Sequence, residues 1–438
     1  MQNWLPCRHV ALSRWVACGG VLLLVVSLAV SHCAVLTMAL ALPLLAVYWY
    51  LGCLDRYDYW LAALPWTILL IPHAVHSHFY VNRGVYASDA ILILSFAILT
   101  FRANPRYKKA GWAGWAVGAM TGWMEVGALV GGYTGHDWAV CLYAMRLALL
   151  AWISFEAARL GGSSAGRRFG ASVLALVGLL GAVACAEAVV RAPLFVGGWF
   201  GDSEVLAIHL VMLLPVGLGF ILAFPAGFSM RSMVGWLAWV LGAAALAMTF
   251  SRSGWAGGYV GLGVVAALSW WYHRRPAAGW VLVLLGLGGL GVVLVLAGLP
   301  ILPESFAPLR GRLGSLVSGH LLDTRLGVWK LGENVLREHP LVGNPDAPNC
   351  YNLYLGLASR SGWPTLLFYV VLVAGTIRSL WRAMPVSGMG LFAAGLTGAL
   401  AGHLVTGIGE SSLSVQVTPE VMSIIGLAAG LGMVRAKE

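Results

Sequence analysis

The sequence predicts an all-α protein, a polytopic membrane helical bundle of about 12–14 transmembrane helices. Apolar residues make up 60% of the 438 residues, charged residues only 10%, and the mean hydropathy is +0.83. Soluble domains carry roughly 25% charged residues. The long apolar runs lack the alternation of barrel strands, and a helix satisfies its own backbone hydrogen bonds in lipid.

The charges in the polar gaps between the apolar runs predict how the helices are oriented across the membrane. Basic gaps alternate with other gaps, as the positive-inside rule requires of cytoplasmic and outer loops. The basic gaps lie at residues 8–14, 56, 102–109, 159–168, 231, 274–275, 378–382 and 435–437. The outer gaps lie near residue 31 and at residues 81–88, 133–137, 191–203, 250–254, 302–350 and 408–419. Both termini are therefore expected in the cytoplasm. Because the basic residues behind the net charge of +10 lie in the gaps between the predicted spans, no nucleic-acid partner is expected.

The chain is predicted to form a single integral membrane domain, residues 1–438, with one large periplasmic loop at residues 302–350 that caps the site. This loop carries more charged residues than any other gap between the apolar runs. Residues 323–338 within it predict an amphipathic helix. Its apolar side chains are expected to lie on the membrane or the bundle; they are Leu326, Trp329, Val335 and Leu336.

Two ionisable residues inside apolar runs are expected to pair. Glu125 and Arg146 lie at similar depths in consecutive predicted helices. A charge inside the membrane is costly unless it is paired or hydrated. The sequence therefore predicts a structural Glu125–Arg146 ion pair.

Arginines gather in the gaps that are predicted to face the periplasm. Arg191 precedes a glycine-rich turn, Arg252 lies in a very short gap, and Arg325 begins the loop helix. Arg310 and Arg312 lie upstream of that helix. Because a guanidinium binds phosphate bidentately and keeps its proton, these residues predict a site for a lipid-linked diphosphate. No Asp-x-Asp pair occurs in the outer gaps, so neither a metal nor another cofactor is expected.

Four short motifs occur in order between residues 191 and 380. Tyr351-Asn352 is followed after nine residues by Gly362-Trp363-Pro364-Thr365. Upstream of it lie Ser251-Arg252-Ser253-Gly254, an Arg-x-x-x-Trp helix at residues 325–329, and His-Pro-Leu-Val-Gly at residues 339–343. Together with Arg191, Gly201 and Asp202, this series resembles the bacterial O-antigen ligase and O-antigen polymerase family. The family's own signature has His where Tyr351 stands and Gly where Thr365 stands.

The resemblance implies an inverting, metal-independent glycosyltransferase of the bacterial inner membrane. Such an enzyme moves a glycan from undecaprenyl diphosphate to an acceptor sugar hydroxyl at the periplasmic face. As an O-antigen ligase its acceptor is lipid A-core in lipopolysaccharide synthesis; an O-antigen or exopolysaccharide polymerase is the alternative. A lipid or glycan transporter is a further alternative. The expected partners are the undecaprenyl diphosphate-linked glycan, the lipid A-core or glycan acceptor, and membrane lipids.

The resemblance also implies roles for individual residues. Arg191 and Arg252 would hold the diphosphate, with Arg310 and Arg312 nearby, and the helix with Arg325 would close the site. Tyr351 and Asn352 stand at the catalytic position, but tyrosine is a poor base at neutral pH because a phenol ordinarily keeps its proton until about pH 10. Either Tyr351 positions the acceptor, or another residue is the base, or the chain is an inactive or divergent relative. The candidate bases are His320, His339, Asp346 and Glu410.

Overall fold

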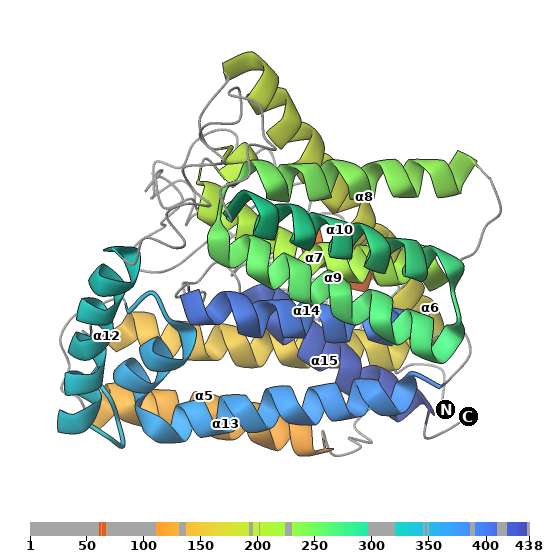
Figure 1. Ribbon diagram of the computed structural model, residues 1–438. Helices are drawn as coiled ribbons and strands as arrows, with labels where there is room; N and C mark the ends of the chain where they lie inside the picture. Colours follow the sequence, from red (N-terminus) through yellow and green to blue (C-terminus); the bar gives the residue numbers. More distant parts are fainter. Residues whose placement is uncertain are drawn as a thin grey trace, which may run out of the picture. The chain divides into compact units, whose positions relative to one another are not determined.

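The computed structural model describes residues 61–62, 64–66, 111–130, 137–191, 196–200, 202–223, 230–296, 320–344, 347, 350–385, 390–409 and 418–435. Every regular element in these residues is helical, so the all-α prediction is confirmed for this part of the chain. The elements are α5 (Gly111–Val130), α6 (Asp137–Arg191), the 3-10 turn η3 (Gly198–Phe200), α7 (Ser203–Ala223), α8 (Met230–Met248), α9 (Arg252–His273), α10 (Pro276–Leu296), α12 (His320–Glu338), α13 (Leu353–Ala383), α14 (Gly390–Gly409) and α15 (Thr418–Arg435) (Figure 1).

Membrane-scale helices are present in the described residues. Four are long and apolar enough to cross a bilayer by length and composition. They are Ser164–Val190 within α6, Ser203–Ala223, Leu353–Ala383 and Gly390–Gly409. A polytopic membrane protein agrees with these helices, whereas the larger number of spans stays a prediction.

The described helices fall into two compact units. The first unit contains α5, α6 as far as Val173, α13 from Ser361 to Ser379, and α15. The second unit contains α6 from Leu174, η3, α7 to α10, α12, α13 before Ser361 and after Ser379, and α14.

The core of the second unit is α7, which packs against both α9 and α14 (Figure 1). Along α7 the side chains from Val205 to Gly219 are buried on every face. A helix that is apolar all round belongs inside a bundle rather than at its surface. The sequence of α7 therefore accounts for its central place.

Glycines let α9 and α14 approach each other closely. A Cβ added to Gly261 of α9 would lie 2.8 Å from the carbonyl oxygen of Gly398 on α14. One added to Gly402 would lie 2.7 Å from the carbonyl oxygen of Gly257. Within each helix the two glycines are four residues apart: Gly257 and Gly261 in α9, Gly398 and Gly402 in α14. This is the small-residue pattern of tightly packed membrane helices. The two helices run antiparallel, so the end of α14 at Gly409 meets the start of α9.

Helix α6 differs from the sequence prediction. A basic gap between two spans was expected at residues 159–168, but α6 continues through them over 55 residues. Its length is then about 83 Å, far more than the roughly 30 Å hydrocarbon core. Arg159 donates hydrogen bonds from Nε and Nη2 to Glu156 Oε2, at 2.9 and 2.6 Å. This one-turn ion pair supports helix where the charges alone suggested a break.

The first unit holds the predicted ion-pair residues in different surroundings. Arg146 of α6 is buried, whereas Glu125 of α5 is exposed. The exposure of Glu125 differs from the buried position that the predicted Glu125–Arg146 ion pair requires, and an ion pair in the described part of α6 joins Arg159 to Glu156. Within α13, Gly362 has φ 81° and ψ 166°, which only glycine adopts readily. The predicted Gly-x-x-x motif is therefore a break in that helix.

Candidate functional site

The Ser251-Arg252-Ser253 turn begins α9 with a fixed geometry. Ser251 is the N-cap, and its Oγ accepts a hydrogen bond from the backbone N–H of Gly254 at 3.2 Å. The Oγ atoms of Ser251 and Ser253 lie 3.3 Å apart. Serine is a preferred N-cap because its oxygen satisfies a first-turn donor. The cap places Arg252 as the first residue of the helix, where it is half-buried.

Arg325 lies on the inward-facing side of α12. The buried residues of this helix are Gly332 and Leu336, and Arg325 is half-buried on the same stripe at helical spacing. The predicted amphipathic helix is confirmed, although Leu326 is exposed rather than packed. Arg325 Nη1 donates a hydrogen bond to the carbonyl oxygen of Gly409 at the end of α14. A charged residue on the buried stripe is thus held by a neighbouring helix end.

The segment after α12 packs back on the start of α13. A Cβ on Gly332 would collide with Cys350 Sγ, so α12 and Cys350 are in close contact. The N–H of Asn344 donates to the carbonyl oxygen of Ser359 at 2.7 Å, and Arg360 Nε donates to that of Ala347 at 3.4 Å. These bonds hold α12 beside the first turns of α13.

Asn352 acts as a structural connector in this geometry. Its Oδ1 accepts from the N–H of Leu355 at 2.9 Å and caps α13. Its Nδ2 donates to the carbonyl oxygen of Ile408 at 3.2 Å. Both ends of the amide are therefore engaged in the fold, while the catalytic role of Asn352 stays a prediction.

Tyr351 precedes this cap in a strained conformation. Its φ is 46°, in the left-handed region that costs a side chain about 1–2 kcal/mol. Its side chain is 44% exposed. The neighbouring cap and the Asn352–Ile408 hydrogen bond fix this backbone, so the phenol stands at the surface of the site.

These motifs meet at the C-terminal end of α14. Thr406 Oγ1 donates to the carbonyl oxygen of Ser253 at 3.3 Å, while Asn352 and Arg325 bind the next carbonyls, of Ile408 and Gly409. Helix N-termini carry partial positive charge. Arg325 and the N-termini of α9 and α13 therefore meet at one place, and Arg252 is the first residue of α9 there. We call the group Arg252, Ser253, Arg325, Tyr351 and Asn352 the arginine end.

The Arg191 segment lies at the same end of the second unit. Arg191 is the last residue of α6, and its side chain is outside the described residues. Shortly after it, the N–H of Val196 donates to the carbonyl oxygen of Met248, which ends α8 just before Ser251. The N–H of Gly198 donates to Glu187 Oε2 at 2.6 Å. The backbone therefore brings Val196, shortly after Arg191, close to the start of α9, while the shared diphosphate role of Arg191 and Arg252 stays a prediction.

Of the other predicted residues, His339 lies away from this place. His339 is exposed after the end of α12, about 14 residues and roughly 21 Å along the axis from Arg325. His320 begins α12, and its side chain is outside the described residues, as are Arg310, Arg312, Asp346 and Glu410. Within the described chain, no three His, Cys, Asp or Glu side chains gather as metal ligands.

Sequence reasoning missed the end of α14 as the anchor of the site. Gly409, Ile408 and Thr406 contribute mainly carbonyl oxygens and a hydroxyl, and nothing in their side chains marks chemistry. The available signal was the glycine pattern Gly398-x-x-x-Gly402 facing Gly257-x-x-x-Gly261. That pattern predicts which helix packs beside the Ser251-Arg252 turn.

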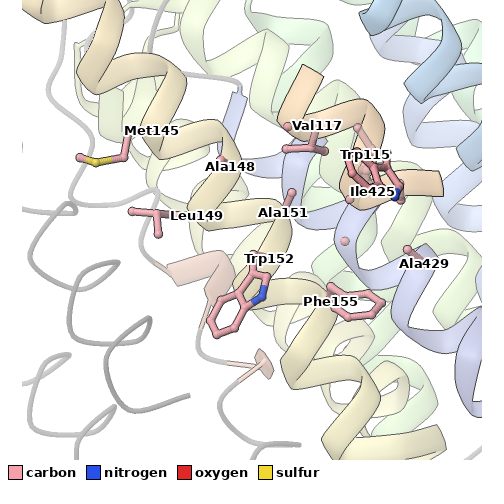
Figure 2. A pocket seen from close by; sticks show the side chains of 14 residues that line it. Trp115, Val117, Met145, Ala148, Leu149, Ala151, Trp152, Phe155, Ile425 and Ala429 are labelled. Carbon is pink, nitrogen blue, oxygen red and sulfur yellow. The ribbon is translucent and has the colours of Figure 1, made fainter. Parts of the chain in front are cut away.

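The first unit contains a separate cavity of about 680 Å³ between α5, α6 and α15 (Figure 2). Side chains that line it include Trp115, Met145, Trp152, Phe155 and Ile425. None of its lining residues is ionisable. It offers an apolar volume without a nucleophile, an acid or a base, so it is no candidate for catalysis.

The fold and site define an all-helical protein with membrane-scale helices and a cationic cluster where several helix ends meet. Comparison with models of known protein families and with characterised proteins found no match for this chain.

Proposed function

We propose that the chain is a glycosyltransferase that moves a glycan from undecaprenyl diphosphate to an acceptor sugar hydroxyl. The proposed acceptor is lipid A-core, which makes the protein an O-antigen ligase in lipopolysaccharide synthesis. The observation that supports it is the convergence of Arg325, Asn352 and the Ser251-Arg252-Ser253 turn on the C-terminal end of α14. These residues come from motifs far apart in the sequence, and it is the order and spacing of the motifs together that supports one chemistry.

A diphosphate suits the arginine end because its negative charge is both large and fixed. Guanidinium groups bind phosphate in a planar, bidentate manner. Arg325 is oriented by its hydrogen bond to Gly409, and the Ser251 cap fixes the backbone at the start of α9, where Arg252 is the first residue. Groups held in place before the reaction stabilise developing charge without reorganising. In many enzymes such electrostatic stabilisation lowers the reaction barrier more than any other effect does.

The proposed reaction is an inverting displacement at the anomeric carbon. The acceptor oxygen forms the new glycosidic bond as the bond between the anomeric carbon and the diphosphate oxygen breaks. The electron pair leaves with undecaprenyl diphosphate, whose negative charge the arginines stabilise. The hydroxyl proton passes to a base, for which His320, Asp346 and Glu410 remain candidates, while exposed Tyr351 positions the acceptor.

The proposed setting is the bacterial inner membrane. From the basic gaps in the sequence we propose that the arginine end faces the periplasm, that both termini lie in the cytoplasm, and that residues 302–350 form a periplasmic loop over the site. About 12–14 spans would complete the bundle.

The purified protein, incubated with undecaprenyl diphosphate-linked glycan and rough lipopolysaccharide, is expected to move the glycan onto lipid A-core. Omitting lipopolysaccharide should abolish the product. A ladder of longer lipid-linked chains in that lane would instead identify a polymerase. Absence of both products, with glycan crossing the bilayer of a proteoliposome, would replace the enzyme with a transporter.

A further inference from the structure

A second cluster of polar side chains lies at the C-terminal end of α9. The helix has 22 residues, so its two ends are about 33 Å apart, close to the thickness of a bilayer's hydrocarbon core. His273, Arg274 and Arg275 form the turn into α10. Arg382 lies near the end of α13, next to Trp381, whose ring contacts that of Tyr272 at 5.8 Å. We call His273, Arg274, Arg275 and Arg382 the basic end cluster.

Two polar atoms of this cluster are shielded from solvent without a hydrogen-bond partner in the described part of the chain. They are His273 Nε2 and Arg275 Nε. Leaving a buried donor or acceptor unsatisfied costs about 1–3 kcal/mol. His273 is also tightly placed, because a Cβ on Gly390 would lie 2.5 Å from its Nε2. The cluster thus contains polar atoms of the kind found in binding sites, and the start of α14 at Gly390 packs against them.

The helices around this cluster carry no acidic side chain. Helices α8, α9, α10, α13 and α14 contain neither Asp nor Glu. The acidic residues of the second unit all belong to residues 187–204, 304–346 and 410, in or beside the gaps at the other end of these helices. Among the residues of the second unit, the basic end cluster therefore has a positive charge without an acidic side chain on the helices beside it, and such a charge attracts an anion.

Exposed indole rings surround the same end. Trp271 is 72% exposed, Trp280 69% and Trp381 50%. Trp270 lies against α10, where its ring would be 3.0 Å from a Cβ on Gly279. Tryptophan is enriched where helices leave the hydrocarbon and enter the headgroup layer. The rings indicate that the basic end cluster lies at the depth of lipid headgroups.

We infer that the basic end cluster binds the phosphate of an anionic phospholipid. The arginines would receive the phosphate oxygens, and the indole rings would lie beside the glycerol and upper acyl chain. Basic pockets between helices at the membrane surface bind acidic headgroups in this way. This site is independent of the glycosyltransferase proposal, because it uses none of the residues of the arginine end.

The test compares lipid retention by variants of the whole protein. Protein from nanodiscs of phosphatidylcholine and phosphatidylglycerol is extracted with detergent, and the lipids that remain bound are measured by native mass spectrometry. Wild type is expected to keep phosphatidylglycerol in preference to phosphatidylcholine. Arg274→Gln and Arg382→Gln are each expected to weaken that retention about fivefold. Both side chains are exposed, so these substitutions leave the core intact.

Arg337→Gln is the matched control, since Arg337 is an exposed arginine on α12 that pairs with Glu333. It should retain phosphatidylglycerol like the wild type. Equal retention of both lipids by the wild type, or unchanged retention by the Arg274→Gln/Arg382→Gln double variant, would overturn the inference. Inorganic phosphate that stabilises the detergent-purified protein as well as phosphatidylglycerol does would assign the cluster to a free anion and overturn the lipid assignment.

Discussion

The two ends of α9 are held against neighbouring helices by different kinds of interaction. At the N-terminal end, polar groups are joined in hydrogen bonds: Ser251 caps the helix, Thr406 binds the carbonyl of Ser253, and Arg325 binds Gly409. At the C-terminal end, rings make the contacts, and polar atoms of His273 and Arg275 have no hydrogen-bond partner in the described chain.

This difference matches the two proposals, in which one end of α9 carries chemistry and the other binds lipid. A hydrogen-bonded network holds charged groups at fixed positions, which transition-state stabilisation requires. Ring contacts tolerate sliding, and unpartnered polar atoms leave room for an external ligand. The arginine end therefore suits catalysis, and the basic end cluster suits attachment to the membrane surface.

The largest expected effect is the loss of glycan transfer in Arg325→Ala. Removing one preorganised donor from an oxyanion site lowers kcat by about 10²–10³-fold. Arg325→Lys should also lose most activity, because an ammonium lacks the planar fork that reaches both Gly409 and a phosphate. Product formation is measured with undecaprenyl diphosphate-linked glycan. Arg337→Ala, on the same helix but exposed, should retain wild-type transfer, and equal losses in both variants would remove Arg325 from the site.

The next effect concerns the close glycine contact between α9 and α14, which lies between the two ends of α9. Gly261→Ala would place a Cβ 2.8 Å from the backbone oxygen of Gly398, and overpacking of this kind costs about 1–3 kcal/mol. Gly263→Ala on the same helix meets nothing within 4 Å and should be neutral or slightly stabilising. Thermal unfolding in detergent distinguishes the two. A Gly261→Ala protein as stable as Gly263→Ala would show that α9 and α14 are not so closely packed.

The sequence predicted the helices of this comparison better than the contacts between them. The helix class, the amphipathic helix around Arg325 and the gap at Arg252 follow from hydropathy and charge, which are properties of side chains. The anchor at Ile408 and Gly409 does not, because the groups that act there are backbone carbonyls. The continuity of α6 through Arg159 was not predicted either, because a cluster of basic residues in the sequence is the same whether the helix stops there or continues.

Asn352 illustrates the same limit at the level of one residue. An Asn beside Tyr351 in a motif suggested catalysis, since a side-chain amide both donates and accepts hydrogen bonds. Its actual partners, Leu355 N–H and the Ile408 carbonyl, depend on the fold. Only the N-cap preference of asparagine could have indicated the first of them.

Substitution of Asn352 should have a moderate effect on stability. Asn352→Ala removes the cap and the bond to Ile408, and loss of an N-cap alone costs about 1 kcal/mol. Asn352→Asp keeps an acceptor for the N–H of Leu355 but places a carboxylate against the Ile408 carbonyl. We expect Asp to be no more stable than Ala in thermal unfolding, whereas Asn352→Ser should recover part of the cap. A fully stable Asn352→Asp protein would contradict the Asn352–Ile408 hydrogen bond.

The smallest effect tests the other end of α9. The edge-on contact of Tyr272 with Trp381 should contribute about 0.5–1.5 kcal/mol beyond the area it buries. A double-mutant cycle with Tyr272→Leu and Trp381→Leu isolates this coupling energy, because each single change removes the ring contact, and Tyr272→Phe serves as the control that keeps the ring. Denaturation in detergent gives the four stabilities. A coupling energy of zero would mean that the rings do not hold α9 to α13, and the contrast between a hydrogen-bonded end and a ring-packed end would then rest on the arginine end alone.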